Sequence, residues 1–187
     1  MSATKPLPFD SLFKAVESDA LAAVHALILS FPSGLDGKEN VYNLLNRAHP
    51  QRKTTVLQLA VNNYPKTSLR LIEILLDYGA GTELPEYSSI EGTPLWIAVK
   101  RNLPVQVIRL LLNYKADIFF KSNFSPFSED EKSNLNCDKI DGFNLLHLAA
   151  KIEANEEILK IILENSFGLL LNDQSNHLRL TPLSKKR

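Results

Sequence analysis

A short motif that recurs four times sets the tightest limit on how this chain can fold. Each copy starts with Thr or Asn and continues with an apolar pair or Pro-Leu, at residues 55–60, 93–98, 144–149 and 181–184. A second apolar block follows the first three copies, at residues 71–76, 107–112 and 158–163. A unit of this kind cannot bury its apolar face alone, so the copies stack on one another. The pattern favours a binding scaffold over a catalytic pocket.

The first residues of the motif are typical of helix N-termini. Thr93 and Thr181 can each accept a hydrogen bond from a free backbone N–H in the first turn of a helix. Pro94 and Pro182 then occupy the first helical position, where the missing N–H of proline costs nothing. Asn144 can cap a helix in the same way. We therefore predict a short first helix in each unit, then a tight turn and a longer helix rich in Leu and Ile.

The second helices and the N-terminal segment carry signals of their own. Asn102 and Asn155 are predicted to start second helices, and Gly79 is placed for a left-handed helix stop. Near the N-terminus, Asp10 and Asp19 are each predicted to cap a helix. This helix pair is expected to be a degenerate first unit, because the terminal unit of a stack has one face in water.

These units resemble ankyrin repeats, whose signature is a Thr-Pro-Leu-His-x-Ala helix start about 33 residues apart. Asp141-Gly142, ahead of Asn144, is similar to the turn that opens a unit in that family, and Gly79-Ala80 is similar to its helix exit. The resemblance covers residues 54–183. It implies an all-α fold, an ankyrin-repeat solenoid of stacked helix-turn-helix units. About three full repeats are expected, with an N-terminal capping helix pair and a partial C-terminal repeat.

The spacing of the motif departs from that of the family. Its starts are 38, 51 and 37 residues apart, so we expect the surplus to lie in the loops between units. With its long insertions, the chain is similar to ankyrin proteins that intracellular bacteria or viruses place inside eukaryotic hosts. We predict a flexible lead-in at 1–8 and an ankyrin-repeat domain at 9–187. Its parts are a cap at 9–31, an insertion at 32–53 with an extra helical turn near Val41, repeats at 54–90 and 91–117, an insertion at 118–140, a repeat at 141–178 and a partial repeat at 179–187.

The insertion at 118–140 is rich in aromatic residues. It contains Phe119, Phe120, Phe124 and Phe127 in an otherwise polar sequence. Two interpretations stay open. The rings can fold back as a lid on the adjacent helices, which keeps them out of water. They can also form an arm that contacts a partner, because binding residues favour loops on a rigid scaffold.

Composition narrows the classes of function. The 21 Lys and Arg residues balance 21 Asp and Glu residues, whereas nucleic-acid binders carry a basic excess. Cys137 is the only cysteine, which excludes an internal disulfide and is typical of a reducing compartment. No apolar run approaches the ~20 residues of a membrane-spanning helix. We expect a cytoplasmic monomer that binds neither nucleic acid nor membranes; for a secreted effector, the compartment is the host cytosol.

Signals for catalysis are missing. There is no Gly-x-Ser-x-Gly motif, and the histidines, at 25, 49, 147 and 177, show no paired spacing. His147 occupies the histidine position of the ankyrin motif, where the resemblance implies that the imidazole braces the turn. Trp96 and Gln58 replace it in the other units, so we expect an uneven brace, with Trp96 packed rather than exposed. We predict no enzymatic activity, no cofactor and no metal site.

The resemblance also implies where a partner protein would bind: a concave face lined by the first helices and the inter-repeat loops. Matching the motif residue by residue places the contacts just after the small residues of each first helix and in the turn before it. They are Asn62, Asn63, Ser89, Glu91, Lys100, Arg101, Lys139, Ile140, Phe143, Lys151 and Ile152, with Phe143 as the best single anchor. The cations among them are either a solvated face or a surface that favours an acidic partner.

Two functions follow from these patterns. The favoured one is a non-catalytic protein–protein interaction scaffold. The alternative is the substrate-targeting region of a larger enzyme or effector whose catalytic part lies outside this chain. Little sequence follows the fourth motif, which ends near Leu183. We therefore expect either a piece of a longer protein, which we favour, or a short C-terminal cap.

Overall fold

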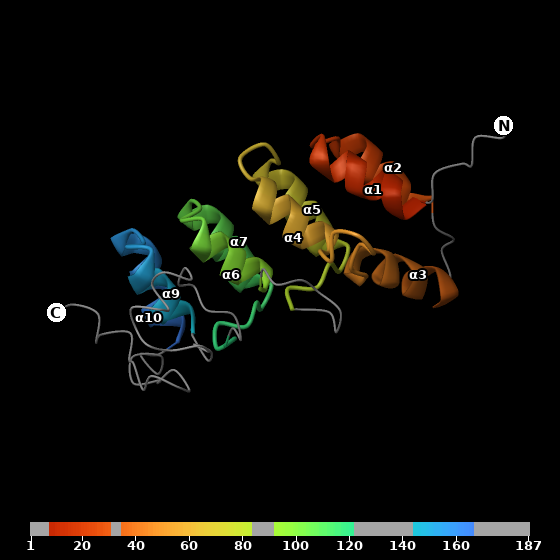
Figure 1. The fold of residues 1–187 in the computed structure, drawn as a ribbon. Helices are drawn as coiled ribbons and strands as arrows, with labels where there is room; N and C mark the ends of the chain where they lie inside the picture. The colour runs from red at the N-terminus through yellow and green to blue at the C-terminus, as the bar shows by residue number, and fades with distance from the viewer. Residues whose placement is uncertain (1–7, 31–34, 84–91, 122–143, 167–187) are drawn as a thin grey trace. The chain divides into compact units, whose positions relative to one another are not determined.

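The computed structural model describes residues 8–30, 35–83, 92–121 and 144–166. All regular secondary structure in these ranges is helical (Figure 1). This confirms the all-α fold predicted from the recurring motif. The chain divides into two compact units, residues 1–89 and 90–187.

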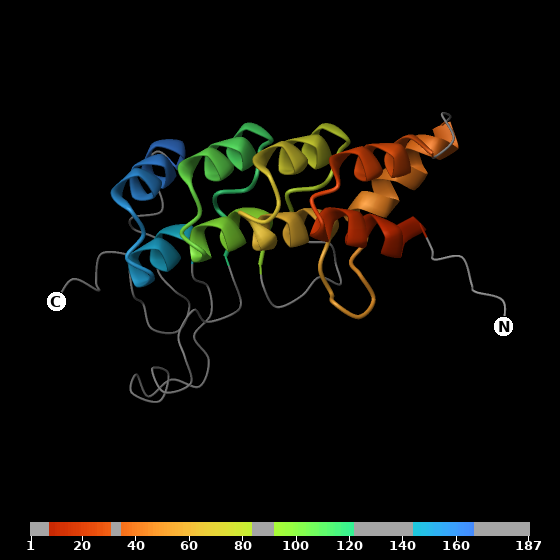
Figure 2. The same cartoon turned by 90° about the horizontal axis from the view of Figure 1, so that it is seen from above.

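The first unit is built on two helix pairs. Helix α1 (Pro8–Glu17) packs on α2 (Leu21–Leu29), and α4 (Val56–Asn63) packs on α5 (Leu69–Asp77). The first helices α1 and α4 also lie side by side (Figure 2). The core that they enclose is apolar and includes the fully buried side chains of Leu12, Phe13, Leu57, Leu71 and Ile72.

A further helix lies where the sequence predicted an insertion. Helix α3 (Leu35–Asn46) has 12 residues, so it is much longer than the extra turn expected near Val41. Leu45 is fully buried. Asn46, at its end, donates a hydrogen bond from Nδ2 to the carbonyl oxygen of Gly79 at 3.1 Å. That bond ties the end of α3 to the exit of α5.

The second unit repeats the same plan. Helix α6 (Pro94–Lys100) packs on α7 (Val105–Asn113), and α9 (Leu145–Lys151) packs on α10 (Glu156–Asn165). The first helices α6 and α9 pack side by side, as do α7 and α10 (Figure 2). Small residues allow the close approach of the first helices, because a methyl side chain adds little width: Ala98 and Ala149 are fully buried.

Helices α5 and α7 end with the same hydrogen-bond pattern. Gly79 has φ +91°, its N–H donates to the carbonyl of Leu76, and the N–H of Ala80 donates to Leu75, both at 2.9 Å. This is the Schellman motif, and it confirms the left-handed stop predicted at Gly79. The same two bonds close α7, where Lys115, with φ +62°, takes the position of glycine.

Three predicted helix caps are wrong. Helix α1 begins two residues before Asp10, which lies in its first turn. The residue that precedes α2 is Ala20, and no side chain caps that helix. Pro104 precedes α7, again without a side-chain cap. Asp19 and Asn102 instead end the first helix of their pair, with φ +52° and +50°, a conformation that Asn and Asp tolerate better than other residues with a Cβ.

Candidate functional site

Polar side chains cap three of the first helices, α4, α6 and α9. The Oγ1 atoms of Thr55 and Thr93 each accept from the backbone N–H three residues later, both at 3.2 Å. Asn144 Oδ1 accepts from the N–H of His147 at 2.9 Å. The caps predicted at Thr93 and Asn144 are confirmed, and the one predicted at Thr181 lies outside the described residues. These caps satisfy backbone N–H groups in the first turns of α4, α6 and α9.

The predicted brace at His147 is also present. Its Nδ1 lies 3.4 Å from the backbone nitrogen of Asn144, whose N–H it accepts, so the two residues form a reciprocal capping box. We expected an uneven brace where Trp96 and Gln58 replace histidine; α6 has the Thr93 cap alone, but Gln58 forms the same capping box as His147. Gln58 Oε1 accepts from the N–H of Thr55 at 2.8 Å. A side-chain amide oxygen therefore replaces the imidazole nitrogen.

Trp96 is packed, as predicted. Its exposed fraction is 4%, and its ring meets that of Phe120 edge to face, with 5.8 Å between the centroids. One ring of the aromatic insertion thus folds back on a first helix, whereas Phe119 is 46% exposed. Phe124 and Phe127 lie outside the described residues, so the choice between a lid and an arm stays open for them.

The predicted contact residues that the structure describes lie at the ends of the first helices. Asn62 and Asn63 form the last turn of α4 and are half-buried. Lys100 and Arg101 stand at the end of α6 and are exposed, and Lys151 and Ile152 stand at the end of α9 and are half-buried. In the second unit the structure thus brings four of these residues to corresponding ends of two packed helices.

The remaining predicted contacts lie outside the described residues. They are the residues predicted from the motif to lie in the turns before the first helices: Ser89, Glu91, Lys139, Ile140 and Phe143. The Asp141-Gly142 turn and Cys137 lie there too. For these residues the contact role stays a prediction.

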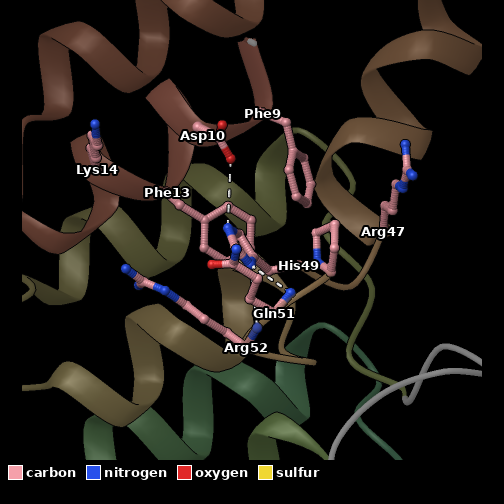
Figure 3. A pocket seen from close by; sticks show the side chains of 9 residues that line it. Phe9, Asp10, Phe13, Lys14, Arg47, His49, Gln51 and Arg52 are labelled. Carbon is pink, nitrogen blue, oxygen red and sulfur yellow. Dashed lines mark hydrogen bonds and ion pairs between the residues drawn. The ribbon is translucent and has the colours of Figure 1, made fainter. Parts of the chain in front are cut away.

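A pocket in the first unit was missed by the sequence analysis. It has a volume of about 500 Å³ and lies between α1 and the segment that follows α3. The rings of Phe9, Phe13 and His49 come together in it, with Arg47 on one side and Arg52 on the other (Figure 3). Phe9 and Phe13 have centroids 4.9 Å apart, and His49 lies 5.6 Å from Phe9 and 4.9 Å from Phe13.

His49 is held in this pocket from both ring nitrogens. Its Nδ1 accepts from the backbone N–H of Gln51 at 3.2 Å and of Arg52 at 3.3 Å. Its Nε2 lies 3.6 Å from Asp10 Oδ1. The imidazole therefore holds the turn at residues 49–52 in place. The adjacent cations Arg52 and Lys53, together with Arg47, were the sequence signal for this place.

The described residues supply little for other kinds of site. Within them, no group of three His, Cys, Asp or Glu side chains could hold a metal ion. None of the helices in those ranges has the length and apolar character that spanning a membrane requires. The described residues instead provide two candidate binding sites: the helix ends in the second unit, and the pocket lined by aromatic and charged side chains in the first.

A comparison with models of known protein families found a match to part of the chain. The family model described as Ankyrin repeat matches residues 92–123, which include α6, α7 and the Trp96–Phe120 contact. This match agrees with the resemblance inferred from the motif. No curated protein matches the chain.

Proposed function

We propose, because this chain is an ankyrin repeat protein, that it is a non-catalytic scaffold that binds a partner protein. Ankyrin repeats generally mediate protein–protein interaction, and stacked repeats present extended concave surfaces for it. The proposed surface consists of the ends of the first helices and the turns that precede them. Its contact residues are those predicted from the motif.

One observation carries this proposal more than any other. Lys100 and Lys151 are the last residues of α6 and α9, which pack side by side. Two cations therefore occupy the same position on neighbouring helices, and exposed Arg101 follows the first of them. Because the whole chain is neutral, this local positive charge favours an acidic partner through association rate and selectivity.

Further contacts are predicted in each of the two units. Ile152, half-buried beside Lys151, supplies apolar area next to the charges. Asn62 and Asn63 present amides at the corresponding position of α4. The turns would add Ser89, Glu91, Lys139, Ile140 and the aromatic anchor Phe143. An apolar anchor surrounded by polar groups is the usual anatomy of a protein interface.

A capture experiment with matched variants tests the proposal. The immobilised chain is exposed to a eukaryotic lysate, and retained proteins are quantified by mass spectrometry. Arg101→Ala is compared with Arg109→Ala, which removes the same side chain from an exposed position on α7. We expect Arg101→Ala to lower the amount of the main captured protein by about tenfold, equivalent to about 1.4 kcal/mol, and Arg109→Ala to leave it within twofold.

Two results would contradict the proposal. Either no protein is enriched over uncoated beads, or both variants lose capture equally. Both arginines are exposed, so the melting temperature should stay unchanged in either variant. Phe143→Ala tests the predicted anchor in the same assay, and unfolding of that variant would mean that Phe143 is structural instead.

A further inference from the structure

The pocket of the first unit is unexplained by the proposed surface. It lies between α1 and residues 47–52, and the recurring motif assigns no contact to these residues. Its volume of about 500 Å³ falls within the roughly 300–1,000 Å³ of ordinary ligand sites. Its lining has an aromatic floor, formed by Phe9, Phe13 and His49, and a charged rim, formed by Asp10, Lys14, Arg47 and Arg52. Together they limit the chemical class of ligand that the pocket can bind.

The floor is apolar and already in place. Phe13 is buried, Phe9 is half-buried, and the two rings contact each other and His49. The hydrogen bonds to His49 Nδ1 and the Asp10 carboxylate beside Nε2 hold the imidazole against them. A floor whose rings are held in this way loses little conformational freedom on binding, which favours an apolar side chain as its occupant.

The rim carries an excess of positive charge. Lys14, Arg47 and Arg52 line the pocket together with a single carboxylate, that of Asp10. That carboxylate already faces His49, and Arg52 already pairs with Glu17. Arg47 lies 5.9 Å from the centre of the Phe9 ring, so it places a cation directly beside the apolar floor. Within the described residues, neither Lys14 nor Arg47 forms an ion pair with a carboxylate.

The occupant is a protein segment rather than a free small molecule. Arg47, Pro50, Gln51 and Arg52 are all exposed, so the pocket opens to solvent along its rim. An open site of this kind would leave much of a free ligand in water, whereas ligand sites for small molecules cover most of the ligand's surface. An extended peptide can place one side chain on the floor and continue along the charged rim.

We propose that this pocket binds an acidic peptide segment of a partner protein, which lays one large apolar side chain on Phe9 and His49 and directs its flanking carboxylates to Lys14 and Arg47. The proposal does not depend on the surface at the ends of α6 and α9. It assigns the first unit a recognition site of its own, with a stated chemistry.

The test titrates the full chain with a short fluorescein-labelled peptide that has one phenylalanine between glutamates and Ser-Gly flanks. We expect saturable binding by fluorescence anisotropy, with amide shift changes in NMR spectra confined to residues 9–14 and 47–53. Replacing the glutamates by glutamine, or the phenylalanine by alanine, should weaken binding about tenfold each. Raising the salt from about 0.05 M to about 0.3 M should weaken it severalfold, since exposed charges are screened.

Charge-reversed variants locate the site. Lys14→Glu combined with Arg47→Glu should abolish peptide binding. The matched control, Lys66→Glu combined with Arg70→Glu, makes the same charge change on exposed positions of the same unit and should keep binding within twofold. Arg101→Ala should have no effect, which separates this site from the proposed function.

The proposal is overturned by any of three results: no saturable binding, equal affinity for the glutamine peptide, or equal loss in the two double variants. Circular dichroism of both double variants checks that they remain folded. Because all four side chains are exposed, the helical signal should not change.

Discussion

Asp19, in the turn between α1 and α2, accepts two hydrogen bonds from Ser68, the residue that caps α5. Its Oδ1 lies 2.8 Å from the Ser68 backbone nitrogen and 3.0 Å from the Ser68 hydroxyl oxygen. Ser68 Oγ in turn accepts from the N–H of Leu71 at 3.2 Å. A carboxylate of one helix pair is therefore placed at the N-terminus of the next, where negative charge is favourable.

The second unit contains the corresponding bond. Asn102 ends α6 as Asp19 ends α1, and its Oδ1 accepts from the backbone N–H of Asn155 at 3.4 Å. Asn155 caps α10, as the sequence predicted, by accepting from Glu157 and Ile158. Residues that sequence reasoning assigned to local caps thus join one helix pair to the next.

The first prediction concerns Asp19. Asp19→Gly should lower the free energy of unfolding by about 1–2 kcal/mol, because glycine keeps the left-handed turn but removes the acceptor. Asp19→Asn keeps the oxygen and tolerates the same φ, so it should cost about 0.5 kcal/mol or less. Urea unfolding followed by circular dichroism measures both. An equal loss in the two variants would show that the bonds to Ser68 contribute nothing.

The second prediction compares two glycines with nearly the same backbone. Gly79 and Gly92 have φ +91° and +89°, but an added Cβ meets nothing within 4 Å at Gly79 and lies 2.6 Å from Trp96 Cδ1 at Gly92. Gly79→Ala should cost about 1 kcal/mol through backbone strain alone. Gly92→Ala should cost about 1–3 kcal/mol more, because Trp96 is buried and must move.

Thermal and urea unfolding of the two alanine variants check this difference. Gly92→Ala combined with Trp96→Leu serves as the control, since it removes the ring that meets the new methyl group. The double variant should lose less than the two single variants together. Equal stability of the two alanine variants would rule out a tight contact with Trp96.

The third prediction concerns the capping boxes. His147→Gln should keep the free energy of unfolding within about 0.5 kcal/mol, because Gln58 makes the same bond in the first unit. His147→Leu fills similar space without an acceptor and should cost about 1 kcal/mol. Gln58→Leu should cost about the same. If His147→Gln is as unstable as His147→Leu, the imidazole acts through packing and not through its nitrogen.

Local features of this fold could be predicted from the sequence because both partners lie within one helical turn. Thr93 and Asn144 cap the helices that follow them, and Gly79 supplies the left-handed stop. The same register places Lys100 and Lys151 at equivalent helix ends. The brace made by Gln58 could also have been foreseen, because an amide oxygen accepts a hydrogen bond as an imidazole nitrogen does.

By itself, then, the sequence determined the helix-turn-helix unit, the starts at Thr93, Asn144 and Asn155 and the stop at Gly79, since capping and apolar periodicity act over a few neighbouring residues. Only the tertiary structure decided what Asp19 binds, how far α3 extends and that Phe9, Phe13 and His49 form a pocket. Asp19 and Ser68 are 49 residues apart, and Asn46 and Gly79 are 33 apart. At such separations a polar side chain has many possible partners, and packing of the helix pairs selects among them.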